Sequence, residues 1–293
     1  MQVRSWVAFA DVARVELTVG DLVFDARAQG PADGELVLLL HGFPQTSFSW
    51  RDQLDALADA GYRAVAPDQR GYSPGARPAD VGEYRVERLV DDVLGFADEL
   101  GVERVHLVGH DWGGAVAWQV AGRHPERLRT LTSLSTPHPA AFRRSIQDGE
   151  QRDKSSYMLF FRSPEAEPFF LDNDAAGLRS LYTASGLADH AVEEYVRVLT
   201  QPGAMAGALN WYRAADVGLV EGLGPITTPT MYVWSTHDPA LGREAAEATA
   251  AHIEGPYRFE VLDGVSHWIA EEAPDALNTL LLAHLDSAST PRQ

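Results

Sequence analysis

Apolar residues change their spacing along the chain, and this spacing predicts alternating strands and helices. Two β-branched runs, Ala13–Val19 and Leu22–Ala28, meet at a Gly-Asp turn and predict an antiparallel hairpin. The run Glu35–Pro44 (ELVLLLHGFP) is nearly continuously apolar, which is typical of a strand buried on both faces of a parallel sheet. Residues 47–60 then carry apolar side chains at helical spacing.

The same alternation continues to the end of the chain, apart from one long interruption. The remaining predicted elements are strands at Tyr62–Asp68, Arg104–Gly109, Leu128–Leu134, Thr230–Trp234 and Tyr257–Leu262 and helices at Val86–Leu100, Ala115–His124, Glu244–His252 and Pro274–Leu285. This order predicts an α/β fold with a doubly wound, mostly parallel sheet. Between the two groups of strands the sequence is aromatic and helix-forming. We expect residues 137–225 to form a helical lid over the carboxyl ends of the strands, on a core made of residues 1–136 and 226–293.

Composition narrows the classes of function. The 293 residues carry a formal net charge of −18, which disfavours binding to nucleic acids and to anionic membranes. The absence of cysteine excludes disulfides, thiolate metal sites and a cysteine nucleophile. The only lysine, Lys154, is not in a phosphate-binding motif, and no run approaches the ~20 apolar residues of a membrane span. We expect a soluble, cytoplasmic protein that is a monomer or a homodimer.

The segment VGHDWGG, residues 108–114, lies between a predicted strand and a predicted helix. Asp111 occupies the place that serine has in the Gly-x-Ser-x-Gly nucleophile turn of hydrolases. Gly109 and Gly113 allow a sharp turn, and the positive end of a helix favours an ionised carboxylate. Aspartate is also a common helix N-cap, so this motif alone does not decide between a nucleophile and a cap.

Three further features favour the nucleophile. The loop HGFP ends the predicted neighbouring strand and supplies the Phe43 N–H, which together with the Trp112 N–H would form an oxyanion hole. Asp238 follows one late strand as the orienting acid, and His267 follows the last strand as the general base. The order nucleophile, acid, histidine is the one that this kind of fold uses. The strand before the lid ends in Ser-Leu-Ser-Thr-Pro and offers no rival carboxylate.

A carboxylate nucleophile restricts the substrate. A serine that attacked an alkyl carbon would leave an ether, which water does not cleave. A carboxylate leaves an alkyl ester, which water activated by His267 can hydrolyse. The electrophile is therefore an sp³ carbon bearing a leaving group, as in an epoxide or an alkyl halide.

The segments HGFPQTSFSWR, APDQRGYSPGARP, GHDWGG and SHW, with the placement of Asp238, resemble the epoxide hydrolases of the α/β-hydrolase fold over nearly the whole chain. The resemblance implies hydrolysis of an epoxide to a vicinal diol through a covalent aspartyl ester, with water as co-substrate and no cofactor or metal. In that family two lid tyrosines hold the epoxide oxygen. The similar segments YMLFF and ALNWYR place them at Tyr157 and Tyr212. A phenol stays protonated at neutral pH and can donate to the alkoxide.

Haloalkane dehalogenases are the main alternative, because they share the aspartate and the tryptophan after it. They hold the halide with two N–H donors. Phe43 has no side-chain donor, so Trp211 is the nearby lid indole that could serve as the second. Fluoroacetate dehalogenases carry an arginine where this chain has Trp112. A catalytically inactive binding protein would be expected to have lost one of the catalytic residues, and all are present. The segment GYSPGARP departs from the commoner Gly-Tyr-Gly form, away from the catalytic set.

Overall fold

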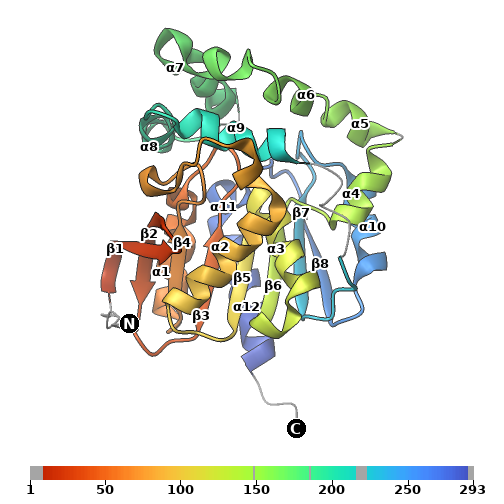
Figure 1. Cartoon of the computed structure of the whole chain (residues 1–293). Coiled ribbons are helices and arrows are strands. Elements are labelled where there is room, and N and C mark those ends of the chain that lie inside the picture. The colour runs from red at the N-terminus through yellow and green to blue at the C-terminus, as the bar shows by residue number, and fades with distance from the viewer. Residues whose placement is uncertain (1–8, 148, 185, 216–222, 290–293) are drawn as a thin grey trace.

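The computed structural model describes residues 9–147, 149–184, 186–215 and 223–289. Its strands form one sheet of eight in the order β1-β2-β4-β3-β5-β6-β7-β8 (Figure 1). They are β1 (Phe9–Val19), β2 (Leu22–Gly30), β3 (Leu36–Leu40), β4 (Arg63–Pro67), β5 (Val105–His110), β6 (Leu128–Leu134), β7 (Thr230–Ser235) and β8 (Tyr257–Leu262). β2 pairs antiparallel with β1 and β4, and all other neighbours are parallel. The mostly parallel sheet is as predicted.

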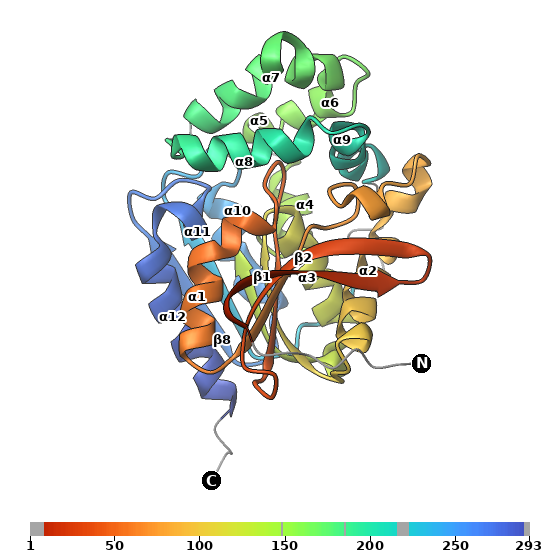
Figure 2. The ribbon, with the colours of Figure 1, turned by 90° about the vertical axis from the view of Figure 1, so that its left-hand side faces the viewer.

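Helices cover both faces of the sheet. α2 (Val86–Glu99) and α3 (Trp112–Arg123) pack on one face, and α1 (Arg51–Asp59) and α12 (Pro274–Ser289) on the other. Figure 2 shows α1 and α12 together on their side of the sheet. Two short helices, α10 (Arg243–Ala248) and α11 (Ile269–Glu272), complete the core.

β3 shows why its sequence is continuously apolar. Leu36, Leu38 and Leu40 belong to the apolar core on the α2 and α3 side. Val37 and Leu39 belong to the core on the α1 and α12 side. Because successive side chains of a strand point to opposite faces, a central strand covered on both sides needs an apolar residue at every position.

In the part of the chain that the structure describes, six helices lie between β6 and β7 in the sequence and over one end of the sheet (Figures 1 and 2). They are α4 (Pro139–Ser145), α5 (Glu150–Lys154), α6 (Tyr157–Phe161), α7 (Ala166–Ala184), α8 (Asp189–Leu199) and α9 (Ala204–Ala214). α7 consists of two helical pieces, because Asn173, Asp174 and Ala175 have positive φ. None of the helices described is long and apolar enough to span a bilayer.

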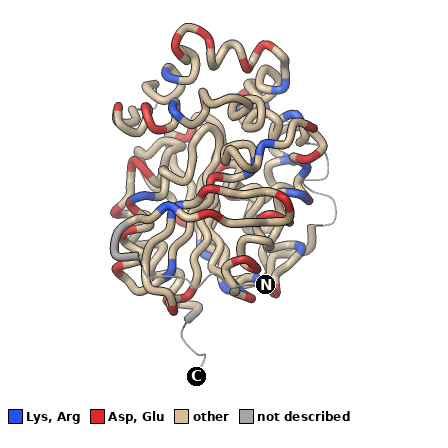
Figure 3. Tube along the Cα trace, turned by 60° about the vertical axis from the view of Figure 1, so that its left-hand side comes forward, with Lys and Arg blue, Asp and Glu red and all other residues tan. Residues whose placement is uncertain are grey.

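The charged residues do not separate into patches. Acidic residues outnumber basic ones by 42 to 24. Figure 3 shows both kinds interspersed along the core and the six helices above it. In this view the residues that the structure describes show no basic stripe of the kind with which a protein follows a nucleic-acid backbone.

Several helix boundaries differ from the sequence prediction, and α12 runs to Ser289, beyond the predicted end at Leu285. α3 begins at Trp112, three residues before the predicted start, because the low helix propensity of two glycines hides its first turn. The predicted helix over residues 47–60 begins as a 3₁₀ turn, Ser47–Trp50. The one predicted over Glu244–His252 ends as another, Thr249–His252. The early start of α3 matters most, since it puts the first free N–H groups of the helix directly after Asp111.

Candidate active site

A sharp turn joins β5 to α3 and carries Asp111. Its backbone has φ 51° and ψ −119°, a conformation that costs energy for residues other than glycine and that clusters at functional sites. The turn is tight, because a Cβ at Gly113 would lie 2.1 Å from the Leu40 carbonyl oxygen. Asp111 occupies the N-cap position, yet its side chain makes no capping hydrogen bond. The helix-cap alternative therefore does not describe what this carboxylate does.

The loop after β3 brings a backbone donor to the carboxylate. The Phe43 N–H donates to Asp111 Oδ1 at 2.8 Å. Position 42, directly before Phe43, needs a glycine, since a Cβ there would lie 2.3 Å from Asp111 Cβ and 2.6 Å from Asp111 Oδ1. Trp112 is the first residue of α3, and N–H groups at that position have no partner within their helix. Backbone N–H groups in such positions can stabilise negative charge on a carboxyl oxygen of Asp111.

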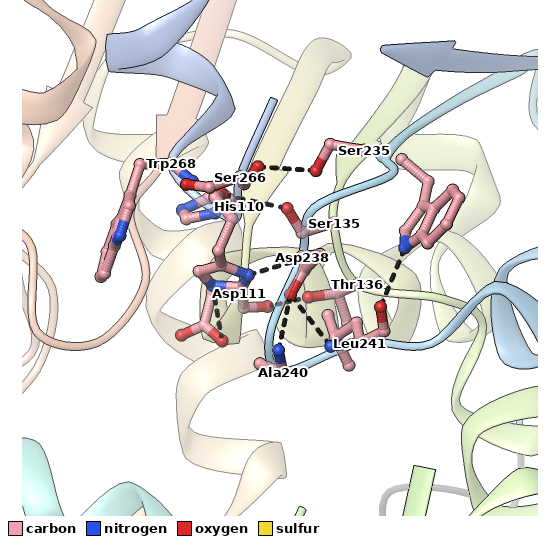
Figure 4. Close-up of polar contacts among 12 residues, drawn as sticks. His110, Asp111, Ser135, Thr136, Ser235, Asp238, Ala240, Leu241, Ser266 and Trp268 are labelled. Carbon is pink, nitrogen blue, oxygen red and sulfur yellow. Dashed lines mark hydrogen bonds and ion pairs between the residues drawn. The ribbon is translucent and has the colours of Figure 1, made fainter. Parts of the chain in front are cut away.

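Asp238 and His267 follow β7 and β8 and meet beside Asp111. His267 Nδ1 lies 2.8 Å from Asp238 Oδ2, and His267 Nε2 lies 3.6 Å from Asp111 Oδ2. Asp238 Oδ1 accepts the N–H groups of Ala240 and Leu241 at 2.8 and 2.9 Å. Figure 4 shows Asp238 beside the N–H groups of Ala240 and Leu241. A histidine held in this way presents its Nε2 toward Asp111.

The charges of the three groups depend on one another. Burial lowers the pKa of His267, but the Asp238 and Asp111 carboxylates outweigh it and raise the pKa to about 10. Burial also raises the pKa of Asp111, while hydrogen bonding to His267 and the imidazolium charge hold it below its ordinary value. Before any substrate reacts, the site therefore holds an ionised Asp111 and a protonated His267 at neutral pH.

Three further side chains, those of His110, Ser135 and Thr136, support this arrangement (Figure 4). His110 Nε2 lies 2.8 Å from the His267 carbonyl oxygen, and Ser135 Oγ donates to the same oxygen at 3.2 Å. Burial and the neighbouring His267 lower the pKa of His110 to about 4, so His110 is neutral and donates one N–H. Thr136 Oγ1 donates to the Asp111 carbonyl oxygen at 2.7 Å. His110 lies in the GHDWGG segment, whereas nothing in the sequence singles out the two hydroxyls.

Tyr157, at the start of α6, and Tyr212, in α9, come together above Asp111. Their ring centroids lie 6.4 Å apart. The Tyr212 ring packs edge-on against Trp112 and Phe43, at 5.0 and 5.2 Å. Loss of hydration and the Asp111 charge raise the pKa of Tyr157, and burial, Tyr157 and Asp111 raise that of Tyr212 well above its ordinary value. Both phenols remain protonated donors at neutral pH.

Two cavities meet at these residues. One has a volume of about 400 Å³ and the other about 530 Å³, and Asp111, Tyr157 and Tyr212 line both of them. His267 and the Phe43 ring line the larger one. Six of the seven residues singled out from the sequence thus line these cavities, which are large enough for a small organic molecule, while Asp238 contacts His267 without lining either cavity.

Two residues near the tyrosines have backbone partners that the sequence does not reveal. The Trp211 indole N–H donates to the Arg70 carbonyl oxygen at 2.8 Å. Arg162, which directly follows α6, donates from Nε to the Tyr212 carbonyl oxygen at 3.0 Å and thereby ties the helices of the two tyrosines together.

Known proteins resemble this chain in both sequence and structure. The family model described as alpha/beta hydrolase fold matches residues 35–274. "AB hydrolase superfamily protein YfhM" of Bacillus subtilis is 38% identical over 268 residues, covering 88% of this chain and 92% of the relative. "Epoxide hydrolase 4" of Mus musculus is 36% identical over 282 residues, covering 92% of this chain and 78% of the relative.

A solved structure, epoxide hydrolase A from Mycobacterium thermoresistibile, superposes with a TM-score of 0.83 at 30% identity and covers 94% of this chain and 98% of its own. The family match spans most of the chain, and the relatives are similar over most of their own length. The chain therefore belongs to the α/β-hydrolase fold family and, within it, to the epoxide hydrolases.

Proposed function

We propose that this protein hydrolyses epoxides to vicinal diols through an ester on Asp111. The observation that carries the proposal is the meeting of an ionised carboxylate with two protonated phenols at the junction of two cavities. Epoxide opening needs these two kinds of group, one to attack carbon and the other to donate a hydrogen bond to the departing oxygen. Similarity to epoxide hydrolases over most of the chain supports the proposal.

In the first step, an Asp111 oxygen forms a bond to a ring carbon and the carbon–oxygen bond of the epoxide breaks. The departing oxygen takes a proton from Tyr157 or Tyr212. The negative charge thus moves from the carboxylate to a phenolate, so the site keeps its net charge. Since Asp111 contributes to the raised pKa of both phenols, the new ester makes the phenolate easier to form.

The ester also changes His267. The Asp111 charge, which helps to raise the pKa of His267, is gone once the ester has formed. His267 then gives its proton to the phenolate and becomes a neutral base. It takes a proton from water, whose oxygen adds to the ester carbonyl, while the Phe43 and Trp112 N–H groups bind the oxyanion. Collapse returns the Asp111 carboxylate, a protonated His267 and the diol, with the remaining water proton on the leaving oxygen.

The Trp211 indole argues against a dehalogenase. Its N–H already donates to the Arg70 carbonyl oxygen, and Trp211 is only 2% exposed. It is therefore not available as the second halide donor. An inactive binding protein is disfavoured as well, because the geometry joins Asp111, Asp238 and His267 at hydrogen-bonding or near hydrogen-bonding distances.

We further propose that residues 137–225 act as a lid domain on a core of residues 1–136 and 226–293. Both tyrosines come from this segment, and its helices lie over the end of the sheet that carries Asp111 (Figure 1). The proposed reaction uses a small-molecule epoxide and water and needs no cofactor. The cytoplasmic location and the monomeric or homodimeric state remain predictions.

The deciding experiment offers the purified protein an epoxide and, separately, a bromoalkane of similar size. We expect diol from the first and no bromide release from the second. Bromide release at a rate comparable to diol formation would favour the dehalogenase instead.

A further inference from the structure

Two side chains of helix α5 form hydrogen bonds with the backbone of the loop that carries Asp238. Gln151 Nε2 donates to the Ala240 carbonyl oxygen at 2.8 Å, and Gln151 Oε1 accepts the Gly242 N–H at 2.8 Å. Lys154 Nζ donates to the carbonyl oxygen of Asp238 itself at 2.7 Å. Gln151 is only 2% exposed, so its two bonds to the loop form away from water.

The two sets of hydrogen bonds in this loop complement each other. The Asp238 carboxylate accepts the N–H groups of Ala240 and Leu241, which turns the loop around the acid. Gln151 and Lys154 satisfy the carbonyl groups of residues 238 and 240 and the N–H of Gly242. The inner set therefore fixes the carboxylate relative to the loop, and the outer set fixes the loop relative to α5.

Gln151 and Lys154 are three positions apart and therefore lie on one side of the helix. α5 has only five residues, and a helix so short is not stable by itself in water. Its contacts with the loop thus support the helix as much as the helix supports the loop. Arg152, on the same helix, is exposed.

We propose that Gln151 and Lys154 are positioning residues for ester hydrolysis, which couple the helical segment above the sheet to the Asp238–His267 pair. This inference rests on the proposed function, because it needs an ester that His267 helps to hydrolyse. The two residues touch neither the cavities nor Asp111 in the contacts described. They act through Asp238, whose Oδ2 lies 2.8 Å from His267 Nδ1.

A role of this kind has a kinetic signature. When ester formation is effectively irreversible, kcat/KM depends on binding and ester formation alone, while kcat and KM both contain the hydrolysis step. A loosened Asp238 loop slows hydrolysis only. Both kcat and KM should then fall together, by about ten- to a hundredfold for a displacement of the order of 1 Å, with kcat/KM unchanged.

The test compares Gln151→Leu, which removes both bonds to the loop, and Lys154→Met, which removes the donor to Asp238. Lys154→Arg should restore much of the loss, because it keeps a charged donor. Arg152→Ala is the matched control on the same helix and should behave as wild type. In rapid-quench mass spectrometry, the fraction of enzyme carrying the ester at steady state should rise toward one in Gln151→Leu and Lys154→Met.

KM does not depend on how much of a variant is folded, and kcat, kcat/KM and the ester fraction are expressed per folded active site, so partial unfolding does not mask the result. The inference is overturned if kcat falls at constant KM, if kcat/KM falls as much as kcat, or if both variants match Arg152→Ala. If the proposed function itself is wrong, the measurement differs: no ester would form with an epoxide, either in wild type or in a variant without His267.

Discussion

Replacing His267 by glutamine should stop the reaction at the ester. Glutamine cannot serve as a base, but its amide N–H can still donate to Asp238. Asp238 also keeps its bonds from the Ala240 and Leu241 N–H groups, at 2.8 and 2.9 Å. The buried acid is therefore not left without partners, and we expect the variant to fold.

The size of the effect follows from the step that His267 serves. A positioned general base contributes about 10²–10⁴ in rate, which corresponds to about 2.7–5.4 kcal/mol of barrier. Ester formation does not use the base, so hydrolysis becomes slow relative to it and the ester accumulates. After incubation with an epoxide, the protein mass should increase by the mass of one substrate molecule, located on the peptide that contains Asp111.

The same variant makes a prediction about pH. In wild type, burial raises the pKa of Asp111, but the contact with His267 outweighs it and holds the pKa below its ordinary value. Without the imidazolium the effect of burial remains, and the Asp111 pKa rises. The rate of ester formation in a single turnover should therefore begin to fall at a higher pH in His267→Gln than in wild type as the solution is made more acidic.

The control is the double variant Asp111→Asn with His267→Gln, in which no adduct should form. Rapid repeated turnover by His267→Gln without an adduct would refute the role of His267 as the base. An adduct on a peptide that lacks Asp111 would refute the nucleophile.

Three further changes test other parts of the structure. Tyr157→Phe and Tyr212→Phe should each lower kcat/KM for an epoxide by about 10²-fold, and the double variant should abolish diol formation because no donor remains; near wild-type diol formation by the double variant would contradict the lid assignment. Gly42→Ala should lose activity while remaining folded by circular dichroism, since its methyl group would lie 2.6 Å from the carboxylate oxygen of the nucleophile; full activity would show that the loop moves easily. Asp92→Ala removes the carboxylate that the buried Arg70 binds at 2.7 and 2.6 Å and leaves it only the longer contact with Glu83, at 3.6 Å, so it should lower the free energy of unfolding in urea by about 3–5 kcal/mol; a loss below about 1 kcal/mol would mean that Glu83 or solvent compensates the Arg70 charge.

The sequence predicted the parts of the site that short local segments determine. The turn at Asp111 needs glycines at fixed offsets, and a strand and a helix on either side leave their own periodicities. Asp238 and His267 each follow a recognisable strand, and parallel strands deliver their carboxyl ends to the same edge of the sheet. For this reason the order of three residues along the chain was enough to predict that they meet.

The predicted helix starts were less accurate where glycine hides the pattern. The first turn of α3 contains Gly113 and Gly114, whose low propensity made the helix appear to begin at Ala115. The tyrosine pair could be named only through a resemblance, because aromatic residues in helices are usually core residues.

The sequence by itself thus predicted the sheet, the carboxylate at the strand-to-helix turn and the proposed chemical class, because these depend on local periodicity and on the identity of one residue. Only the tertiary structure showed that the Trp211 N–H is already hydrogen-bonded, and which side chains hold the loop of Asp238 in place. The Trp211 N–H is engaged by a carbonyl distant in the sequence, and the Asp238 loop is gripped by Gln151 and Lys154. Such contacts join residues far apart in the chain through single hydrogen bonds, and a hydrogen bond to a backbone carbonyl leaves no pattern in the sequence of either partner.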